Sequence, residues 1–330
     1  MMAMVTAGQG GYEQLVYREV PVPALQPGEV LLQVLAAGIN NTDINTRVGW
    51  YGAGWNGATP FPLIQGADCC GRVLALAPDV PGPSVGQRVL VRSCMRTAGF
   101  GSMETRWLGT DLDGAFAQYL KVPASEVFAV QSDWTDAELA SLPCAWGTAE
   151  NMLERARLQA GERVWVTGAS GGVGSAAVLL AKRRGAVVTA ITSRDKQAQV
   201  EALGADTVLC REDGSGAFAQ LPAPDLVVDN VAGAGFTALL QALRRGGRYV
   251  TSGAIAGADV ALDLRALYLR DISLIGSTAW DEPVFPNLVG YVERNEVRPV
   301  VAATYALHDM AQAQQAFLEK RHTGNFVLIP

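Results

Sequence analysis

Hydrophobic positions along the chain change their spacing near residue 136. Before that point the apolar runs are short, as in Glu29–Ala37 and Arg88–Val91. Prolines and glycines interrupt them, with five prolines at Pro21, Pro23, Pro27, Pro81 and Pro83. Short apolar runs between turn residues are typical of β-strands. The first third of the chain is therefore predicted to be β-rich.

After residue 136, helical stretches alternate with buried apolar strands. The predicted strands are Val164–Gly168, Ala186–Thr192, Asp225–Asn230, Gly247–Gly253 and Asp271–Ser277. Strands that alternate with helices at this rhythm form parallel βαβ units. This part of the chain is predicted to be a parallel sheet with helical connections.

The last 40 residues are expected to return to the first domain. They hold a predicted strand at Val297–Thr304, an amphipathic helix at Asp309–Lys320 and the apolar ending NFVLIP. The predicted organisation is a β-rich domain at 1–123, a nucleotide-binding domain at 124–290 and a C-terminal return at 291–330.

Composition narrows the function classes. The 330 residues are 49% hydrophobic and 18% charged, which is typical of a compact globular enzyme. The net charge is -6 and there is no basic run, so neither nucleic acid nor an anionic membrane is an expected partner. No apolar stretch approaches the roughly 18 residues of a membrane span, and the first residues lack the features of a signal peptide. Five cysteines without a C-x-x-C pair suit a reducing compartment, so we expect a cytoplasmic protein that acts on a small-molecule substrate.

A glycine-rich turn lies between the first predicted parallel strand and a helix. It contains Ser170, Gly171, Gly172 and Val173, and follows G-x-G-x-x-G except that Ala169 replaces the first glycine. Glycines in such a turn let the backbone approach a pyrophosphate, which the helix N-terminus stabilises. A lone glycine pattern is usually only a tight turn, but within a βαβ unit it predicts a dinucleotide site.

The end of the second parallel strand favours NADPH over NADH. NAD sites place a carboxylate there to bind the ribose 2′-hydroxyl. This chain has Ser193 followed by Arg194 and Lys196, which offer a hydroxyl and two cations to a 2′-phosphate. The alternative is a solvated helix start at which Asp195 weakens the positive field.

Several ordered segments resemble the medium-chain dehydrogenase/reductase superfamily. They are PGEVLLQVLAAGIN (27–40), GADCCGRV (66–73), VGQRVLV (85–91), DGAFAQYLKVP (113–123), LPCAWGTA (142–149), the glycine turn, DNVAG (229–233) and the terminal HTGNFVLIP. The resemblance implies an α/β protein that combines a Rossmann-fold nucleotide-binding domain with a GroES-like β-rich catalytic domain. It also implies a cofactor site that includes Thr148 and Gly253, and a homodimer joined through the predicted edge strand Asp271–Ser277.

The residues at the family's zinc positions predict that no catalytic metal is bound. Zinc-dependent alcohol dehydrogenases of this family carry a Cys after AAG-x, a GHE segment and a later Cys or acidic ligand. Here the first position is Asn40, GHE has become Gly66-Ala67-Asp68, and only Cys144 matches. Asp68 and Cys144 alone are too few ligands for a catalytic zinc. We interpret Cys144 as a small buried residue beside the cofactor.

Without zinc, the resemblance points to the quinone oxidoreductase and 2-enoyl thioester reductase branches. The segment from Ile39 to Gly52 is similar to the enoyl reductase segment, and Tyr51 falls at its proposed proton-donor tyrosine. The tyrosine of many quinone oxidoreductases would fall at Asn45. Thr42 matches the hydroxyl that relays protons in the zinc enzymes. Tyr51 is a proton donor, part of an aromatic wall with Trp50, Trp55 and Phe61, or both.

Asn40, Thr42 and Tyr51 suit the reduction of a conjugated alkene. Hydride addition to such an alkene or to a quinone gives a delocalised enolate, which hydrogen bonds can stabilise. We therefore expect NADPH-dependent hydride transfer, with Thr42 or Tyr51 binding the carbonyl oxygen and Tyr51 or water supplying the proton. Two alternatives stay open. One is a zinc alcohol dehydrogenase with ligands from Asp68, Cys144 and the Cys69-Cys70 pair, and the other is a non-enzymatic NADPH-binding protein.

Overall fold

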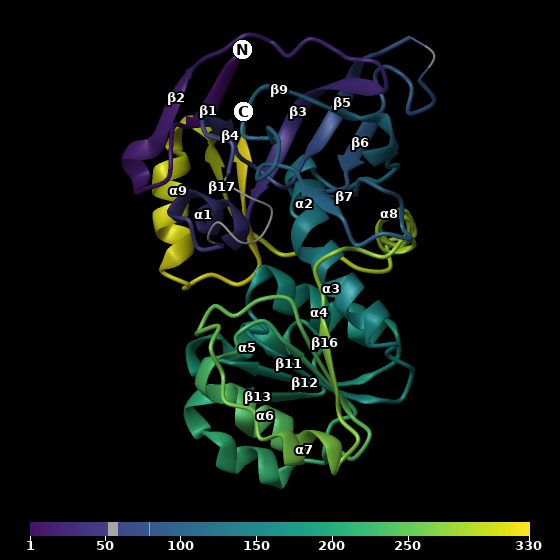
Figure 1. Cartoon of the computed structure of the whole chain (residues 1–330), viewed down its shortest axis with the longest axis vertical. Helices are drawn as coiled ribbons and strands as arrows, with labels where there is room; N and C mark the ends of the chain where they lie inside the picture. Colours follow the sequence, from purple (N-terminus) through teal and green to yellow (C-terminus); the bar gives the residue numbers. More distant parts are fainter. Residues whose placement is uncertain (52–58, 79) are drawn as a thin grey trace. The chain divides into compact units, whose positions relative to one another are not determined.

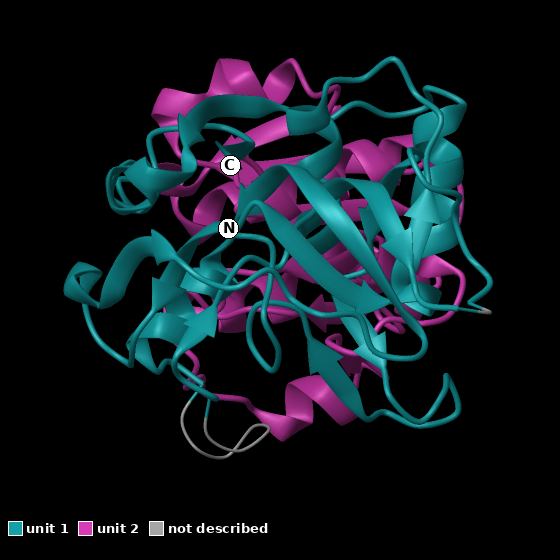
Figure 2. Cartoon of the chain, turned by 90° about the horizontal axis from the view of Figure 1, so that it is seen from above, with its two compact units in different colours: residues 1–145, 285–330 teal, residues 146–284 magenta. Residues whose placement is uncertain are grey.

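A computed structural model of the chain describes residues 1–51, 59–78 and 80–330, which form two compact units (Figures 1 and 2). Unit 1 comprises Met1–Ala145 and Phe285–Pro330, and unit 2 comprises Trp146–Val284. The boundary placed after residue 123 from the sequence falls inside unit 1. The chain stays in unit 1 for longer because helix α2 (Asp136–Ala140) packs against strands β3 (Glu29–Ile39) and β5 (Cys70–Leu76).

Unit 1 is built on sheets whose strands pair antiparallel, except that its last two strands pair in parallel. Its other strands are β1 (Met2–Thr6), β2 (Leu15–Glu19), β4 (Leu63–Ile64), β6 (Arg88–Val91), β7 (Cys94–Arg96), β8 (Thr105–Trp107), β9 (Tyr119–Pro123), β10 (Val127–Ala129), β17 (Val301–Ala306) and β18 (Asn325–Ile329). The main sheet has the order β10-β6-β5-β3-β18-β17, and β9 also pairs with β3. The 11-residue strand β3 is central because β5, β9 and β18 all pair with it, so the C-terminal strand completes the sheet of the first domain.

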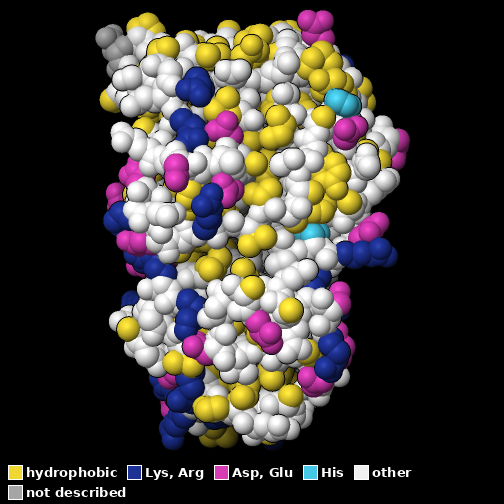
Figure 3. All heavy atoms as spheres, turned by 180° about the vertical axis from the view of Figure 1, so that it is seen from behind, with side chains coloured by type: hydrophobic (Ala, Val, Ile, Leu, Met, Phe, Trp, Pro, Cys, Tyr) yellow, Lys and Arg dark blue, Asp and Glu magenta, His cyan; other side chains and the backbone are white. Residues whose placement is uncertain are grey.

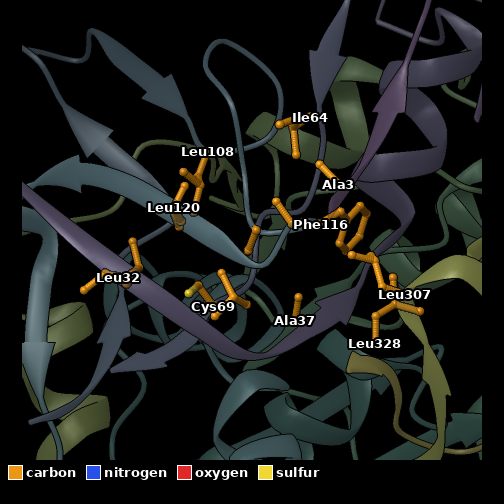
Figure 4. Close-up of a cluster of buried hydrophobic side chains, with 14 of the residues drawn as sticks. Ala3, Leu32, Ala37, Ile64, Cys69, Leu108, Phe116, Leu120, Leu307 and Leu328 are labelled. Carbon is orange, nitrogen blue, oxygen red and sulfur yellow. The ribbon is translucent and has the colours of Figure 1, made fainter. Parts of the chain in front are cut away.

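The core of unit 1 lies around β3. Leu32, Ala37 and Leu328 come from the paired strands β3 and β18, and Phe116 packs in the same cluster with Leu307 (Figure 4). All five are nearly inaccessible to solvent. Burial of such apolar surface stabilises the sheet by about 25 cal/mol per Å² removed from water. It also holds the end of β3 firmly, and helix α1 (Asn41–Val48) starts there.

Unit 2 has one parallel sheet. Its strands are β11 (Arg163–Thr167), β12 (Val187–Thr192), β13 (Thr207–Cys210), β14 (Leu226–Asp229), β15 (Arg248–Thr251) and β16 (Ser273–Gly276). All pairs are parallel and the order is β13-β12-β11-β14-β15-β16. The order reverses between β11 and β14, and ligands of open parallel sheets bind at such a reversal. The parallel sheet predicted from the sequence is confirmed for its five predicted strands, and β13 is a sixth strand that was not predicted.

Helices connect the strands of both units. Those not yet named are α3 (Pro143–Arg155), α4 (Gly172–Arg183), α5 (Gln197–Glu201), α6 (Phe236–Ala242), α7 (Leu264–Tyr268), α8 (Val284–Glu293) and α9 (Met310–Leu318). No helix among the described residues has the length and apolar character needed to cross a membrane. One face of the molecule shows basic and acidic side chains intermixed (Figure 3).

Two elements near the C-terminus differ slightly from the prediction. Strand β17 begins at Val301 rather than Val297, because Pro299 intervenes and has no N–H for a sheet hydrogen bond. The predicted helix at 309–320 is confirmed as α9, which ends at Leu318.

Candidate functional site

Asn40 joins strand β3 to helix α1 and is held from two directions. Its backbone N–H donates to Asp43 Oδ2 at 2.8 Å, which is the N3-to-N-cap bond of a capping box. Its side-chain Nδ2 donates to Asp68 Oδ2 at 2.7 Å. Asp68 in turn accepts a hydrogen bond at Oδ1 from the Cys144 N–H at 2.6 Å. The orientation of Asn40 is therefore fixed by two buried carboxylates.

Burial changes the acidity of both carboxylates. Asp43 is 1% exposed and Asp68 is 0% exposed. Burial raises the pKa of Asp68 to about 7, and it also raises the pKa of Asp43 to about 7, with a further contribution from the charge of Asp68. Each of the two carboxyl groups can therefore gain or lose a proton near neutral pH. Sequence reasoning missed Asp43, although Asn40 followed three residues later by an acid is a capping signal.

Gly38 makes room for the Asp68 side chain. A Cβ at Gly38 would lie 2.4 Å from Asp68 Oδ2 and 2.8 Å from the backbone oxygen of Ala140. Real Cβ contacts are essentially never that close, so any other residue at position 38 would displace the carboxylate that holds Asn40.

Thr42 and Tyr51 form a pair of hydroxyl groups. Thr42 lies in the first turn of helix α1, and Tyr51 follows the end of the helix. Gly49 ends the helix with a φ of 75°, and Trp50 N–H donates to Asn45 O at 2.9 Å, which turns the chain back. The Tyr51 hydroxyl donates to Thr42 Oγ1 at 3.2 Å. Loss of hydration raises the pKa of Tyr51, so the phenol keeps its proton at neutral pH.

The alternative interpretation of Tyr51 as an aromatic wall stays open. Trp50 is 52% exposed and Tyr51 is 41% exposed, so both rings present a surface to solvent. Phe61 is partly buried. Trp55, the fourth aromatic residue of the predicted wall, lies outside the described residues.

In unit 2 the glycine turn has the geometry of a dinucleotide cradle. Gly168 adopts a φ of 57°, and Gly171 is the extended residue before helix α4. A Cβ at Gly174 would lie 2.1 Å from Gly168 O, so strand and helix approach closely only without a side chain there. Ala169 is fully buried, and the left-handed conformation that a glycine supplies lies one residue earlier, at Gly168.

The turn therefore fits a pyrophosphate. The first N–H groups of helix α4 have no partner within the helix, which suits an anion bound at Ser170, Gly171, Gly172 and Val173.

Asp229 braces the sheet where the strand order reverses. Its fully buried carboxylate accepts hydrogen bonds from the hydroxyls of Thr167 and Tyr249 and from the backbone N–H groups of Val231 and Ala232. These contacts tie the carboxyl ends of β11 and β14 to strand β15. The bracing role of Asp229 was not recognised from the sequence, although the segment DNVAG pointed to it.

Two further residues of the predicted cofactor site lie in unit 2. Thr148 is half-buried on α3, beside Gly147, where a Cβ would meet the ring of Trp280 at 2.2 Å. Gly253 follows β15, and a Cβ there would lie 3.5 Å from Asn230 O. Asn230 itself accepts a hydrogen bond from Ser252 Oγ at 2.6 Å.

Ser193, Arg194 and Lys196 follow β12, as predicted, but their surroundings differ. Arg194 is 62% exposed and forms an ion pair with Asp213. Lys196 is 7% exposed, burial lowers its pKa, and it forms no ion pair with any described residue. The acidic partner of Arg194 was not foreseen, because it follows a different strand, β13.

All five cysteines are buried, and no disulfide is recorded among them in the described residues. Burial raises the pKa of Cys144 well above its usual range, and the charges of Asp68 and Asp43 raise it further. Within the described ranges, no group of three or more His, Cys, Asp and Glu residues is arranged to hold a metal ion.

Comparisons with known proteins identify the family. Residues 26–132 match the alcohol dehydrogenase GroES-like domain, and residues 172–294 match the zinc-binding dehydrogenase domain. A structure from Sinorhizobium meliloti 1021 with the provisional name alcohol dehydrogenase is 42% identical, with a TM-score of 0.95 over 100% of this chain and 96% of that one. The chain belongs to the medium-chain dehydrogenase/reductase superfamily, and it is an oxidoreductase of the kind that uses a pyridine nucleotide.

Two relatives bear on the choice of reaction. The acryloyl-coenzyme A reductase of Metallosphaera sedula is 29% identical over 99% of both chains. The structure of the 2-octenoyl-CoA carboxylase reductase CinF, in complex with NADP and 2-octenoyl-CoA, is 28% identical. Its TM-score is 0.87, and the match covers 96% of this chain and 82% of CinF.

Proposed function

We propose that this oxidoreductase reduces an activated C=C bond or a quinone with NADPH and without a catalytic zinc. The observation that carries the proposal is the group of polar side chains at the start of α1. There Asn40 is locked by Asp68, and the Tyr51 hydroxyl is bonded to Thr42. Relatives named as acryloyl-CoA and 2-octenoyl-CoA reductases support an enoyl thioester as the substrate class.

The roles of the side chains follow from their chemistry. A bound nicotinamide would supply hydride to the β-carbon of the substrate. Thr42 or Tyr51 would donate a hydrogen bond to the carbonyl oxygen, which gains negative charge as the enolate forms. Tyr51 keeps its proton at neutral pH and can give it up to the enolate, unless water does so. Asn40 is a positioning residue in this scheme, because its amide and backbone hold the first turn of α1.

NADPH is the proposed cofactor because Ser193 stands where NAD sites carry a carboxylate. Lys196 supports this choice, since it is a buried cation that forms no ion pair with the residues that the structure describes. Calorimetric titration with NADPH and NADH tests the preference, and equal dissociation constants would contradict it.

The function is tested by following NADPH oxidation with enones, quinones and enoyl thioesters. The proposal expects turnover with at least one of these classes and none with simple ketones. The second candidate is an alcohol dehydrogenase, which the 42% identical structure and the matched zinc-binding dehydrogenase domain favour. One tightly held zinc per chain in elemental analysis, together with alcohol oxidation, would establish that candidate instead.

A homodimer joined through β16 is also proposed. This strand lies at the end of the sheet order in unit 2, and Leu274 within it is exposed. Nearby in the sequence, Leu264, Tyr268 and Leu269 on and after α7 are exposed as well. A second copy of β16 would cover the unpaired edge. Light scattering at micromolar concentration should give twice the chain mass. The five buried cysteines, among which no disulfide is recorded, support a cytoplasmic location.

A further inference from the structure

Strands β12 and β13 place two charged segments side by side at the carboxyl edge of the unit 2 sheet, which is the side where its parallel strands end. The strands are parallel, and Thr192 at the end of β12 is paired with Cys210 at the end of β13. The residues that follow each strand therefore meet. They are Ser193 and Arg194 on one side, and the short helix η4 (Arg211–Asp213) on the other. In this fold the ribose that carries the 2′-substituent is bound at the end of the second strand.

Both acidic residues of η4 hold Arg194. The guanidinium of Arg194 forms an ion pair with Asp213 Oδ1. The Arg194 backbone N–H donates to Glu212 Oε2 at 3.1 Å. Asp213 is 42% exposed and also lines a surface hollow of about 520 Å³ with Leu209 and Leu221. Asp213 therefore both pairs with Arg194 and borders this hollow.

Charges of both signs are balanced at this edge. Arg194, Lys196 and Arg211 supply three positive charges, and Asp195, Glu212 and Asp213 supply three negative charges. A 2′-phosphate carries close to two negative charges and prefers an excess of cations, whereas a 2′-hydroxyl is neutral. A phosphate bound here must share Arg194 with Asp213 and is repelled by the Asp213 carboxylate.

We propose that Asp213 is a specificity-determining residue of the cofactor site, which limits the preference for a 2′-phosphate by holding Arg194 in an ion pair. This inference rests on the proposed binding of a dinucleotide at the glycine turn. In this proposal the choice between a 2′-phosphate and a 2′-hydroxyl depends on η4 as well as on the residues that follow β12. Lys196 then remains available to the phosphate.

The test is calorimetric titration of the full chain with NADP⁺ and NAD⁺. Asp213→Asn keeps the size of the side chain and removes its charge. The variant should bind NADP⁺ about three- to tenfold more tightly, and its affinity for NAD⁺ should stay within about twofold of the unaltered protein. In an Arg194→Ala background, the same Asp213→Asn change should lose most of its effect, because no arginine is left to release.

Glu319→Gln is the control for loss of an exposed ion pair. Glu319 forms such a pair with Arg321 at 3.6 Å, but it lies in unit 1, outside the nucleotide-binding unit. Its substitution should leave both affinities unchanged.

The outcomes separate this inference from the proposed function. Equal changes for NADP⁺ and NAD⁺, no change with Asp213→Asn, or a full effect without Arg194 would overturn the role of Asp213. If the unaltered protein binds neither nucleotide, the cofactor assignment and this inference both fail. If it binds them but reduces no alkene or quinone, the proposed reaction fails and the role of Asp213 is judged by the titrations alone.

Discussion

The start of α1 in unit 1 and the carboxyl edge of the sheet in unit 2 position their polar groups in different ways. At α1, Asn40, Asp43 and Asp68 are buried and each is held by more than one hydrogen bond. After β12, Arg194 and Asp213 are exposed and form an ion pair in water. Unpaired buried polar groups are costly, so a buried network has one stable arrangement. An exposed ion pair contributes little and can be exchanged for a ligand.

We infer from this difference that the two regions serve different functions. The buried network suits a site where a hydroxyl must be held close to a reacting carbonyl. The exposed edge suits a site where a charged group enters and leaves with each cofactor molecule. Substitutions should therefore have large effects on turnover or folding at α1 and modest, ligand-dependent effects after β12.

The largest effect is expected from Tyr51→Phe, which keeps the ring and removes the hydroxyl. If Tyr51 binds the carbonyl oxygen or donates the proton, turnover should fall by roughly 10²–10⁴-fold with unchanged NADPH affinity. Steady-state kinetics on the best substrate and calorimetry check the two quantities. Thr42→Val should lose less. Near-full turnover of Tyr51→Phe, with chemistry limiting the rate, would make Tyr51 a wall and solvent the proton source.

Gly38→Ala tests whether the buried Asp68 carboxylate can shift without loss of stability. The added Cβ would collide with Asp68 Oδ2 and Ala140 O, so the free energy of unfolding should fall by about 1–3 kcal/mol. Urea denaturation measures the change. Gly101→Ala is the control, since a Cβ at Gly101 meets no atom within 4 Å. Equal stability of the two variants would show that the Asp68 side chain has room to move.

Asp68→Asn should alter the pH dependence of stability. The pKa of Asp68 is about 7 in the folded chain and near 3.8 in the unfolded chain. Between these values the folded state holds more protons, so Asp68 makes the free energy of unfolding fall as pH rises towards 7.

The asparagine variant lacks this titration. Its deficit in unfolding free energy relative to the unaltered protein should therefore be larger at pH 5 than at pH 8, by about 1–2 kcal/mol. Urea denaturation at the two pH values measures this, and a deficit that is the same at both would indicate an ordinary pKa for Asp68.

The smallest effect is expected at the exposed edge. Arg194→Ala should weaken NADPH binding by about tenfold or less, because the side chain is already shared with Asp213, and should leave NADH binding almost unchanged. Calorimetry with both nucleotides measures the change. A loss for NADH as large as that for NADPH would mean that Arg194 supports the fold of the edge rather than the phosphate.

The predicted elements show which features of the fold can be inferred from the local pattern of residues. Five of the parallel strands, the glycine turn before α4 and helix α9 follow from apolar spacing and turn residues and are confirmed, whereas strand β13 was not predicted. Strand β17 begins later than predicted because apolar residues continue across Pro299, where pairing is not possible. Asn40, Thr42 and Tyr51 could be chosen as candidates because they lie close together in the chain and resemble a family segment.

What the sequence by itself determined is therefore the class of fold, the family and the chemical types of the candidate residues, since these depend on neighbours within a few positions. Only the tertiary structure brought Asp68 to Asn40 across 28 residues and Asp213 to Arg194 across 19. Both partners are supplied by a different segment of the chain, and no local pattern records which one. The physical reason is that charge balance and burial are properties of the folded neighbourhood. They decide whether a carboxylate holds a proton near neutral pH and whether a cation is free for a ligand.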